Sequence, residues 1–140
     1  MAVRSKGDDY AFGMTHEATI LPKLQCHWGD EANIRNTKEK YSTDFCPYDF
    51  ESDMDSSWEV KSRRIRKHAY ATTLLGVNKV RDVTTPQYFV FVYTDKMCYI
   101  RYDKELFDTF MTTDITVFRN GAIPKPTPHY LIPIEQLIDF

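Results

Sequence analysis

The segment from Tyr48 to Arg66, YDFESDMDSSWEVKSRRIR, constrains the fold of this chain more than any other. Apolar and polar residues alternate in two short stretches, 48–51 and 58–61, and a polar run at 52–57 separates them. Because side chains of a β-strand point alternately to its two faces, such alternation is typical of strands with one buried face. Two such stretches joined by Ser and Asp residues predict a β-hairpin.

The register of this hairpin decides which side chains meet. A turn centred on Met54 places Asp49 opposite Glu59. One face of the hairpin is then aromatic and apolar, and consists of Tyr48, Phe50, Trp58 and Val60. The other face carries four charged side chains, those of Asp49, Glu51, Glu59 and Lys61.

Asp49 and Glu59 repel each other in this arrangement. Two carboxylates about 5 Å apart repel by roughly 3 kcal/mol at an effective dielectric constant of about 20. A chain that keeps such a pair generally places a cation between the acids or protonates one of them. Because carboxylate oxygens are hard ligands, Mg²⁺ or Mn²⁺ suits the site better than zinc. We therefore predict a divalent-metal site with Lys61 beside it; an exposed polar face is the alternative.

Upstream of the hairpin, a pattern at helical spacing predicts a helix that opens at Gly13 and Thr15 and ends at 29–31. The stripe that faces the core consists of Glu17, Leu21, Leu24 and Trp28. Glu17 is either a first-turn acid favoured by the helix dipole or a further ligand of the metal. Pro22 either kinks the helix or marks its first turn.

Three other acids lie close to the hairpin in sequence. Asp53 and Asp55 fall in the turn, where we expect them to be solvated turn formers. Asp44 is the alternative to Asp49 as a metal ligand, although it lies off the charged face.

Basic residues follow the hairpin directly, in the run KSRRIRKH at 61–68. The formal net charge of the chain is −2, so its bulk composition does not indicate a nucleic-acid-binding protein. A local basic patch is sufficient to contact phosphates, and this one begins where the predicted metal acids end. A solvated strand end is the alternative. We predict contacts with nucleic-acid phosphates by Arg63, Arg64, Arg66 and Lys67. Lys79, further along the chain, is either a further contact with the DNA backbone or an ordinary surface lysine.

These residues resemble a known family. Asp49, a gap of nine residues and the triplet Glu59-Val60-Lys61 are similar to the motif of the PD-(D/E)XK nucleases, the restriction-endonuclease-like superfamily. The upstream acid Glu17 and the basic residues after Lys61 belong to the resemblance, which extends from about residue 12 to residue 103. The chain departs from the motif in one place, since Tyr48 separates Pro47 from Asp49.

The resemblance implies an α/β fold with a restriction-endonuclease-like core, in which helices flank a mixed central β-sheet. It implies a metal-dependent endonuclease or exonuclease that hydrolyses DNA phosphodiesters in repair, recombination or viral DNA processing. Mg²⁺, for which Mn²⁺ would substitute, would be bound by Asp49, Glu59, Glu17 and the backbone carbonyl of Val60, with Lys61 as the catalytic lysine. A catalytically inactive nucleic-acid-binding or assembly module of the same fold is the alternative, and a hydrolase of small phosphate esters is a third possibility.

In the rest of the chain, the residue pattern predicts strands and short helices. The near-continuous β-branched and aromatic run at 88–93 predicts a strand buried on both faces, with a hairpin partner at 97–102. We further expect a short helix at 78–83, a helix at 104–111, strands at 115–119 and 130–133, a Pro-rich loop at 124–128 and a last helical turn at 135–140.

The length and composition predict one domain over residues 1–140, with residues 1–11 loose. Since no apolar run approaches membrane-spanning length and no signal sequence is evident, we expect no membrane partner. Three cysteines without a CxxC pair favour a reducing, intracellular compartment, and Cys26, His27 and Cys46 fit no zinc-site spacing. The small size suits a viral, phage or bacterial protein, and the aromatic strands offer a surface for a homodimer. Nucleotide-binding Gly motifs and a His-centred triad are lacking.

Overall fold

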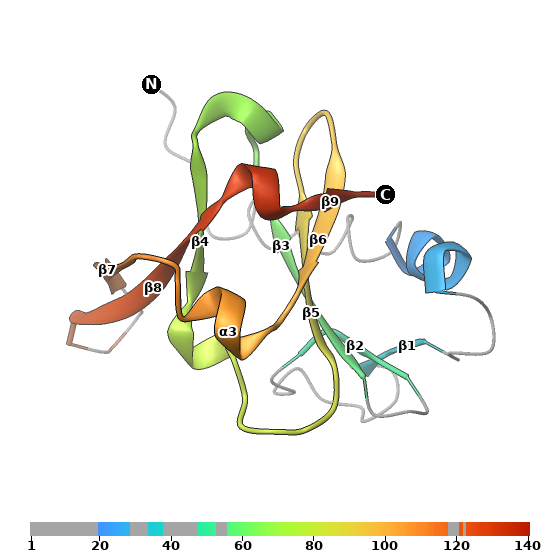
Figure 1. Ribbon diagram of the computed structural model, residues 1–140, viewed down its shortest axis with the longest axis horizontal. Coiled ribbons are helices and arrows are strands. Elements are labelled where there is room, and N and C mark those ends of the chain that lie inside the picture. Colours follow the sequence, from blue (N-terminus) through green and yellow to red (C-terminus); the bar gives the residue numbers. More distant parts are fainter. Residues whose placement is uncertain (1–19, 29–33, 38–47, 53–55, 118–120, 122) are drawn as a thin grey trace.

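In a computed structural model, residues 20–28, 34–37, 48–52, 56–117, 121 and 123–140 are described. Within these residues the strands form two sheets (Figure 1). The larger sheet contains, in spatial order, β1 (Arg35–Asn36), β2 (Phe50–Glu51), β3 (Ser57–Ser62), β5 (Gln87–Val92), β6 (Met97–Arg101) and β9 (Ile138–Asp139). The smaller sheet contains β4 (Thr72–Gly76), β8 (Lys125–Pro133) and β7 (Thr112–Val117).

Helical elements make up little of the described chain. Residues 20–28 form an α-helix, and a second one is the single turn α3 (Lys104–Phe107). The structure also contains three 3₁₀ turns within residues 56–117 and 123–140: η2 (Lys67–Ala69), η3 (Val77–Lys79) and η4 (Ile134–Gln136). β3 runs parallel to β5, whereas the other neighbouring strands are antiparallel. The predicted mixed sheet is therefore present, in a fold that is mostly β.

β2 and β3 form the predicted hairpin in the predicted register. Phe50 lies opposite Trp58 and Glu51 lies opposite Ser57, which is the pairing of a turn centred on residue 54. The backbone amide of Asp49 donates to the carbonyl oxygen of Trp58 at 3.0 Å, one residue away from the Asp49–Glu59 pairing that this register would give, so the regular pairing ends at Phe50.

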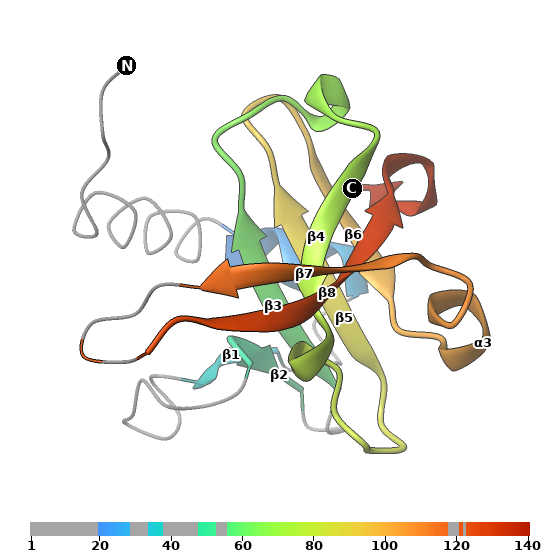
Figure 2. The same cartoon turned by 90° about the vertical axis from the view of Figure 1, so that its left-hand side faces the viewer.

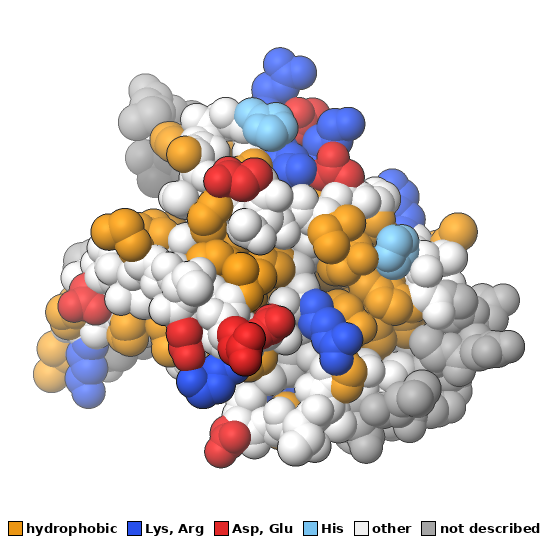
Figure 3. All heavy atoms as spheres, in the orientation of Figure 1, with side chains coloured by type: hydrophobic (Ala, Val, Ile, Leu, Met, Phe, Trp, Pro, Cys, Tyr) orange, Lys and Arg blue, Asp and Glu red, His pale blue; other side chains and the backbone are white. Residues whose placement is uncertain are grey.

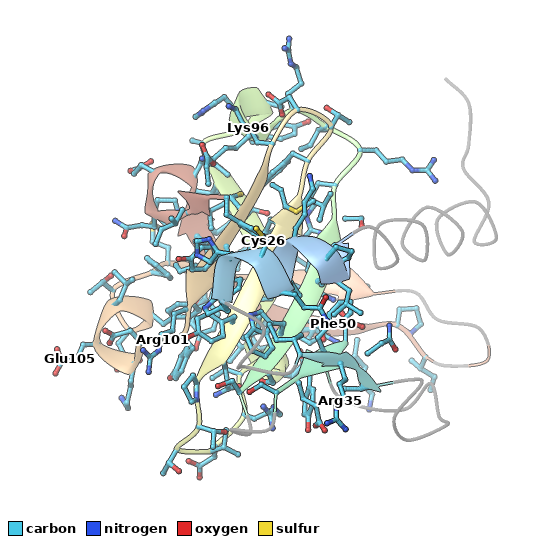
Figure 4. All side chains as sticks on the ribbon, turned by 90° about the vertical axis from the view of Figure 1, so that its right-hand side faces the viewer. Cys26, Arg35, Phe50, Lys96, Arg101 and Glu105 are labelled. Atoms are coloured by element: carbon cyan, nitrogen blue, oxygen red, sulfur yellow. The ribbon has the colours of Figure 1, made fainter. Side chains whose placement is uncertain are left out.

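Each face of the larger sheet buries its own apolar cluster. On one face, helix 20–28 lies across the strands, as Figure 4 shows with Cys26 on the helix and Phe50 on β2 beside it. This cluster contains Ile20, Leu24, Ile34, Phe50, Trp58, Val90 and Val92. The two leucines of the predicted stripe follow the expectation, since Leu24 is fully buried and Leu21 packs against the cluster.

The opposite face is covered by a second sheet, where we predicted helices. β4, β8 and β7 lie over the larger sheet in two perpendicular views (Figures 1 and 2). The cluster between the two sheets includes Leu75, Phe89, Phe91, Cys98, Ile100, Phe107 and Ile132. The chain between β3 and β5 therefore crosses over by way of a strand, β4, in which Thr73 and Leu75 alternate inward.

The hairpin of β5 and β6 confirms the prediction for 88–93 and 97–102, since five of the six residues of β5 are buried. Other boundaries differ. The predicted helix at 104–111 ends at Phe107, and the predicted helix at 78–83 is the 3₁₀ turn Val77–Lys79. The final segment forms η4 and then pairs with β6 as β9.

The Pro-rich segment is a strand and not the loop that we predicted. Residues 125–128 belong to β8, where they pair with β7 but extend past the end of β4. The amide of Leu131 in β8 donates to the carbonyl of Met111, next to β7. Because successive amides of a strand point to opposite sides, the even-numbered positions of β8 face the side of β4. At Pro126 and Pro128 the missing N–H would point to that side, where β8 has no partner strand among the described residues, so no hydrogen bond of the sheet is lost.

Candidate active site

The predicted acids Asp49 and Glu59 lie next to each other at the hairpin. Glu59 is on β3, between β2 and β5, and its side chain is 12 % exposed. Asp49 lies immediately before β2, and its Oδ2 accepts a hydrogen bond from the backbone amide of Val60 at 2.7 Å. This bond holds the Asp49 carboxylate beside the strand that carries Glu59.

The backbone of Val60 faces the same side of β3 as Asp49. The carbonyl of Trp58 accepts from Asp49, and the amide of Val60 donates to Asp49. The amide of Ser57, by contrast, donates to Pro86 on the side of β5. Because the N–H and C=O of one strand residue point to one side and those of the next residue to the other, the carbonyl of Val60 lies on the side of Asp49.

The pKa of the Glu59 carboxyl is raised above its usual range. Burial is the largest cause and the nearby Asp49 carboxylate is the second, because both disfavour the charged form. Lys61 and Lys79 oppose this rise in pKa, with their Nζ atoms 3.1 Å and 3.5 Å from Glu59 Oε1. Two acids and two lysines thus converge on one partly buried position, where a bound divalent cation would relieve the repulsion between the carboxylates.

Two hydrogen bonds between the side chain of Gln87 and the backbone of Arg81, here called the Gln87–Arg81 bracket, hold the segment that follows Lys79. The side-chain amide of Gln87 accepts from the backbone amide of Arg81 at 2.8 Å and donates to its carbonyl at 2.9 Å. The Arg81 guanidinium donates to Ser57 Oγ at 2.6 Å and lies over the ring of Tyr48, 4.4 Å from its centroid. We predicted Lys79 as a possible contact with the DNA backbone, and its contact with Glu59 was not predicted.

The placement of Tyr48 corrects one part of the predicted hairpin face. Its hydroxyl donates to Glu51 Oε2 at 2.9 Å, and its ring contacts Arg81, so it lies with polar groups and not with Phe50. The reason is local, because β2 begins at Phe50 and strand alternation does not extend back to Tyr48.

A cleft of about 970 Å³ opens beside the lysines, between β3 and the smaller sheet. Its basic lining residues are Lys61, Arg63, Lys67, Lys79 and Lys125, with His129. Among the described residues that line the cleft, none is Asp or Glu. The cleft is therefore suited to an anionic ligand, and two of its lining lysines, Lys61 and Lys79, are also the partners of Glu59.

Arg63 is the one predicted DNA-contacting arginine that lines the cleft within the described residues. Its Nη2 donates to the carbonyl of Leu74 at 2.7 Å, and its guanidinium lies 5.7 Å from the centroid of the Phe91 ring. Burial lowers its pKa, with a smaller opposing effect of Tyr93. Within the described ranges no carboxylate forms an ion pair with it, so it is a buried cation that a phosphate would neutralise.

The other predicted DNA-contacting residues that precede η3 are either paired with an acid or lie outside the cleft lining. Lys67 is buried, and its Nζ lies 2.6 Å from Asp139 Oδ1, so its charge is already paired. Arg66 is 81 % exposed near Asp95, and neither Arg66 nor Arg64 lines the cleft. Basic and acidic side chains gather together where the β3–β4 connection meets the β5–β6 turn (Figure 3).

Several predicted residues lie outside the described part of the chain. These are Glu17, Asp44, Asp53, Asp55 and Cys46, together with residues 1–11. Among the described residues, no group of three or more His, Cys, Asp or Glu side chains is arranged to bind a metal. Of the predicted metal ligands, the described residues include Asp49, Glu59 and the Val60 carbonyl. In the part of the chain that the structure describes, no helix is long and apolar enough to cross a membrane.

Comparison of the chain with family models, with curated protein sequences and with solved structures gave no match in any of the three.

Proposed function

We propose that this chain is a metal-dependent nuclease of the restriction-endonuclease-like kind, which hydrolyses DNA phosphodiester bonds. One observation carries the proposal. Two neighbouring carboxylates, one of them largely buried with a raised pKa, lie beside Lys61 and Lys79, and these lysines line a cleft whose described lining is basic and free of acids. A bound divalent cation would account for the paired carboxylates, and a bound polyanion would account for the lysines and the arginine of the cleft.

The donor set suits Mg²⁺ or Mn²⁺. Asp49 and Glu59 supply carboxylate oxygens, and the carbonyl of Val60 lies on the side of Asp49, so all three candidates are hard oxygen ligands. Glu17, outside the described residues, would be a further ligand. When bound, the metal supplies polarisation of the phosphate and acidification of a water molecule.

The chain's own cations would perform the remaining steps. Lys61, 3.1 Å from Glu59, would orient or deprotonate the attacking water, or stabilise the charge that develops on the phosphate. Lys79 reaches the same carboxylate from η3 and would contact a neighbouring phosphate. Arg63 and Lys125 would bind phosphates further along the cleft.

The test is cleavage of plasmid, single-stranded and branched DNA with Mg²⁺ or Mn²⁺ against EDTA. We expect cleavage only with the metal, and a loss of about 100-fold or more in Asp49→Asn, Glu59→Gln and Lys61→Ala. Lys104→Ala and Glu105→Gln, which change exposed charges on α3, are the matched controls and should cleave normally. Equal rates in wild type and the three site variants would show that the catalytic assignment is wrong.

A non-catalytic DNA-binding module is the second candidate. The observation that favours it is the pairing of Glu59 with Lys61 and Lys79, which compensates the carboxylate without a metal. A thermal unfolding measurement separates the two. A metal site predicts that Mg²⁺ raises the unfolding temperature of wild type but not of Glu59→Gln. Unchanged unfolding with Mg²⁺, together with DNA binding in EDTA and no cleavage, would favour the binding module.

A further inference from the structure

The rim of the basic cleft is apolar. Ile65, Tyr70 and Ile123 line the cleft, and they are 37 %, 68 % and 83 % exposed. The other large hydrophobic side chains exposed within the described ranges are Val83, Met111 and Ile138, so half of this set gathers at one site. Exposed apolar side chains that cluster beside a ligand cleft indicate contact with apolar parts of the ligand.

The backbone on both sides of Tyr70 is anchored, although the side chain is 68 % exposed. Tyr70 directly follows η2, whose first residue, Lys67, is tied to Asp139 by its side chain and to Asp95 by its backbone amide. After Tyr70, the carbonyl of Ala71 accepts from the amide of Ile134 at 3.0 Å. The backbone is thus anchored on both sides of a ring that points away from the core, as expected of a preformed contact surface.

The charged and apolar parts of the cleft select one class of ligand. Arg63, Lys79 and Lys125 suit a phosphate backbone, and the ring of Tyr70 suits a flat apolar group. In duplex DNA the base faces are stacked inside the helix, so an exposed aromatic ring finds nothing to stack on. Unpaired bases have free faces, and proteins bind single strands by combining basic grooves with aromatic rings.

We propose that the cleft binds single-stranded DNA, with one unpaired base stacked on Tyr70 while Ile65 and Ile123 cover its edges. This inference deepens the proposed function, because it rests on DNA as the ligand of the cleft and names the form of DNA that is bound. It does not require cleavage to occur.

The test is fluorescence anisotropy in EDTA with a labelled oligothymidylate of about 16 nucleotides, and with a duplex of the same length. We expect the single strand to bind about 10-fold or more tightly than the duplex. Tyr70→Ala should weaken single-strand binding by about 5- to 100-fold, as loss of one stacked base does, and leave duplex binding unchanged. Tyr70→Phe keeps the ring and should bind as wild type does.

Met111→Ala is the matched control, because Met111 is 75 % exposed and does not line the cleft. Single-strand binding that survives Tyr70→Ala, or a duplex that binds as tightly as the single strand, would overturn the inference. An RNA strand that binds more tightly than the DNA strand would overturn the assignment to DNA. Since all arms are measured without metal, loss of the nuclease hypothesis would appear separately, as selective single-strand binding without Mg²⁺-dependent cleavage.

Discussion

Two effects raise the pKa of the Glu59 carboxyl: burial of the side chain and the neighbouring negative charge of Asp49. The Glu59 side chain is 12 % exposed, with Asp49 close by, and the pKa of its carboxyl is raised even though Lys61 and Lys79 are paired with it. The folded protein therefore favours the protonated form of Glu59 more than the unfolded chain does. Its contribution to stability is fully present below the unfolded pKa and is lost as the pH rises through the higher folded pKa.

Asp49→Asn should lower the pKa of Glu59, because it removes the neighbouring negative charge. The asparagine oxygen can still accept from the Val60 amide, so the hairpin is kept. At pH 7 without metal we expect the free energy of unfolding to rise by on the order of 1 kcal/mol. The gain should vanish in acid, where Glu59 is protonated. Urea denaturation at the two pH values measures the difference.

Asp49→Ala is the companion variant. It removes the same charge but also the acceptor for the Val60 amide, at a cost of about 1–3 kcal/mol. It should therefore be less stable than Asp49→Asn. Equal stability of the two variants would show that the hydrogen bond adds nothing, and a Glu59 pKa that is unchanged in both would contradict the electrostatic account.

At the scale of elements, the short turn η3 matters because it delivers Lys79 to Glu59. A 3₁₀ turn of three residues has little stability of its own. The Gln87–Arg81 bracket joins the segment that follows η3 to β5 of the larger sheet. Gln87 is 4 % exposed, so these hydrogen bonds are shielded from water.

Gln87→Ala should destabilise the protein by about 1–3 kcal/mol, since it leaves the backbone groups of Arg81 without their side-chain partner. Urea denaturation measures the loss, and faster hydrogen exchange at the Arg81 amide localises it. Gln136→Ala, at an exposed position in η4, is the control and should change stability little. If the Arg81 amide exchanged as slowly in Gln87→Ala as in wild type, the bracket would not be what holds this segment.

At the scale of the whole molecule, net charge and local charge have opposite signs. The formal net charge is −2, yet the described lining of the cleft contains five lysines and arginines and no acid. The acids of the described residues lie outside this lining, and two of them, Asp95 and Asp108, pair with Arg66 and Lys104, which do not line the cleft. Binding of a nucleic acid would therefore depend on the cleft and not on the overall charge.

Replacement of one cleft cation should change the salt dependence of single-strand binding. In Lys125→Ala we expect the slope of log K against log salt concentration to be smaller in magnitude by about 0.7, which corresponds to one lost phosphate contact. Anisotropy titrations between about 50 and 200 mM salt measure this slope. Lys104→Ala, whose lysine is paired with Asp108 outside the cleft, should leave it unchanged. Identical slopes in the two variants would place the DNA elsewhere.

Much of the candidate site could be predicted from the sequence because it is local. Asp49 and Glu59 are joined by a short hairpin, and the two-residue period of the strands determines which side chains share a face. The same period predicts the buried strand β5 and its partner β6. It failed at Tyr48, where the strand ends, and at Pro126 and Pro128, where a missing partner strand makes proline acceptable.

The sequence by itself determined the paired acids, with Lys61 following on the same strand. Only the tertiary structure decided that a second sheet covers one face, that Lys79 reaches Glu59 and that Arg63 and Tyr70 share a cleft with Lys125. The physical reason is that these contacts join segments far apart in the chain, such as β4 and β8. Periodicity carries no information about such pairings, which depend on how whole apolar faces cover one another.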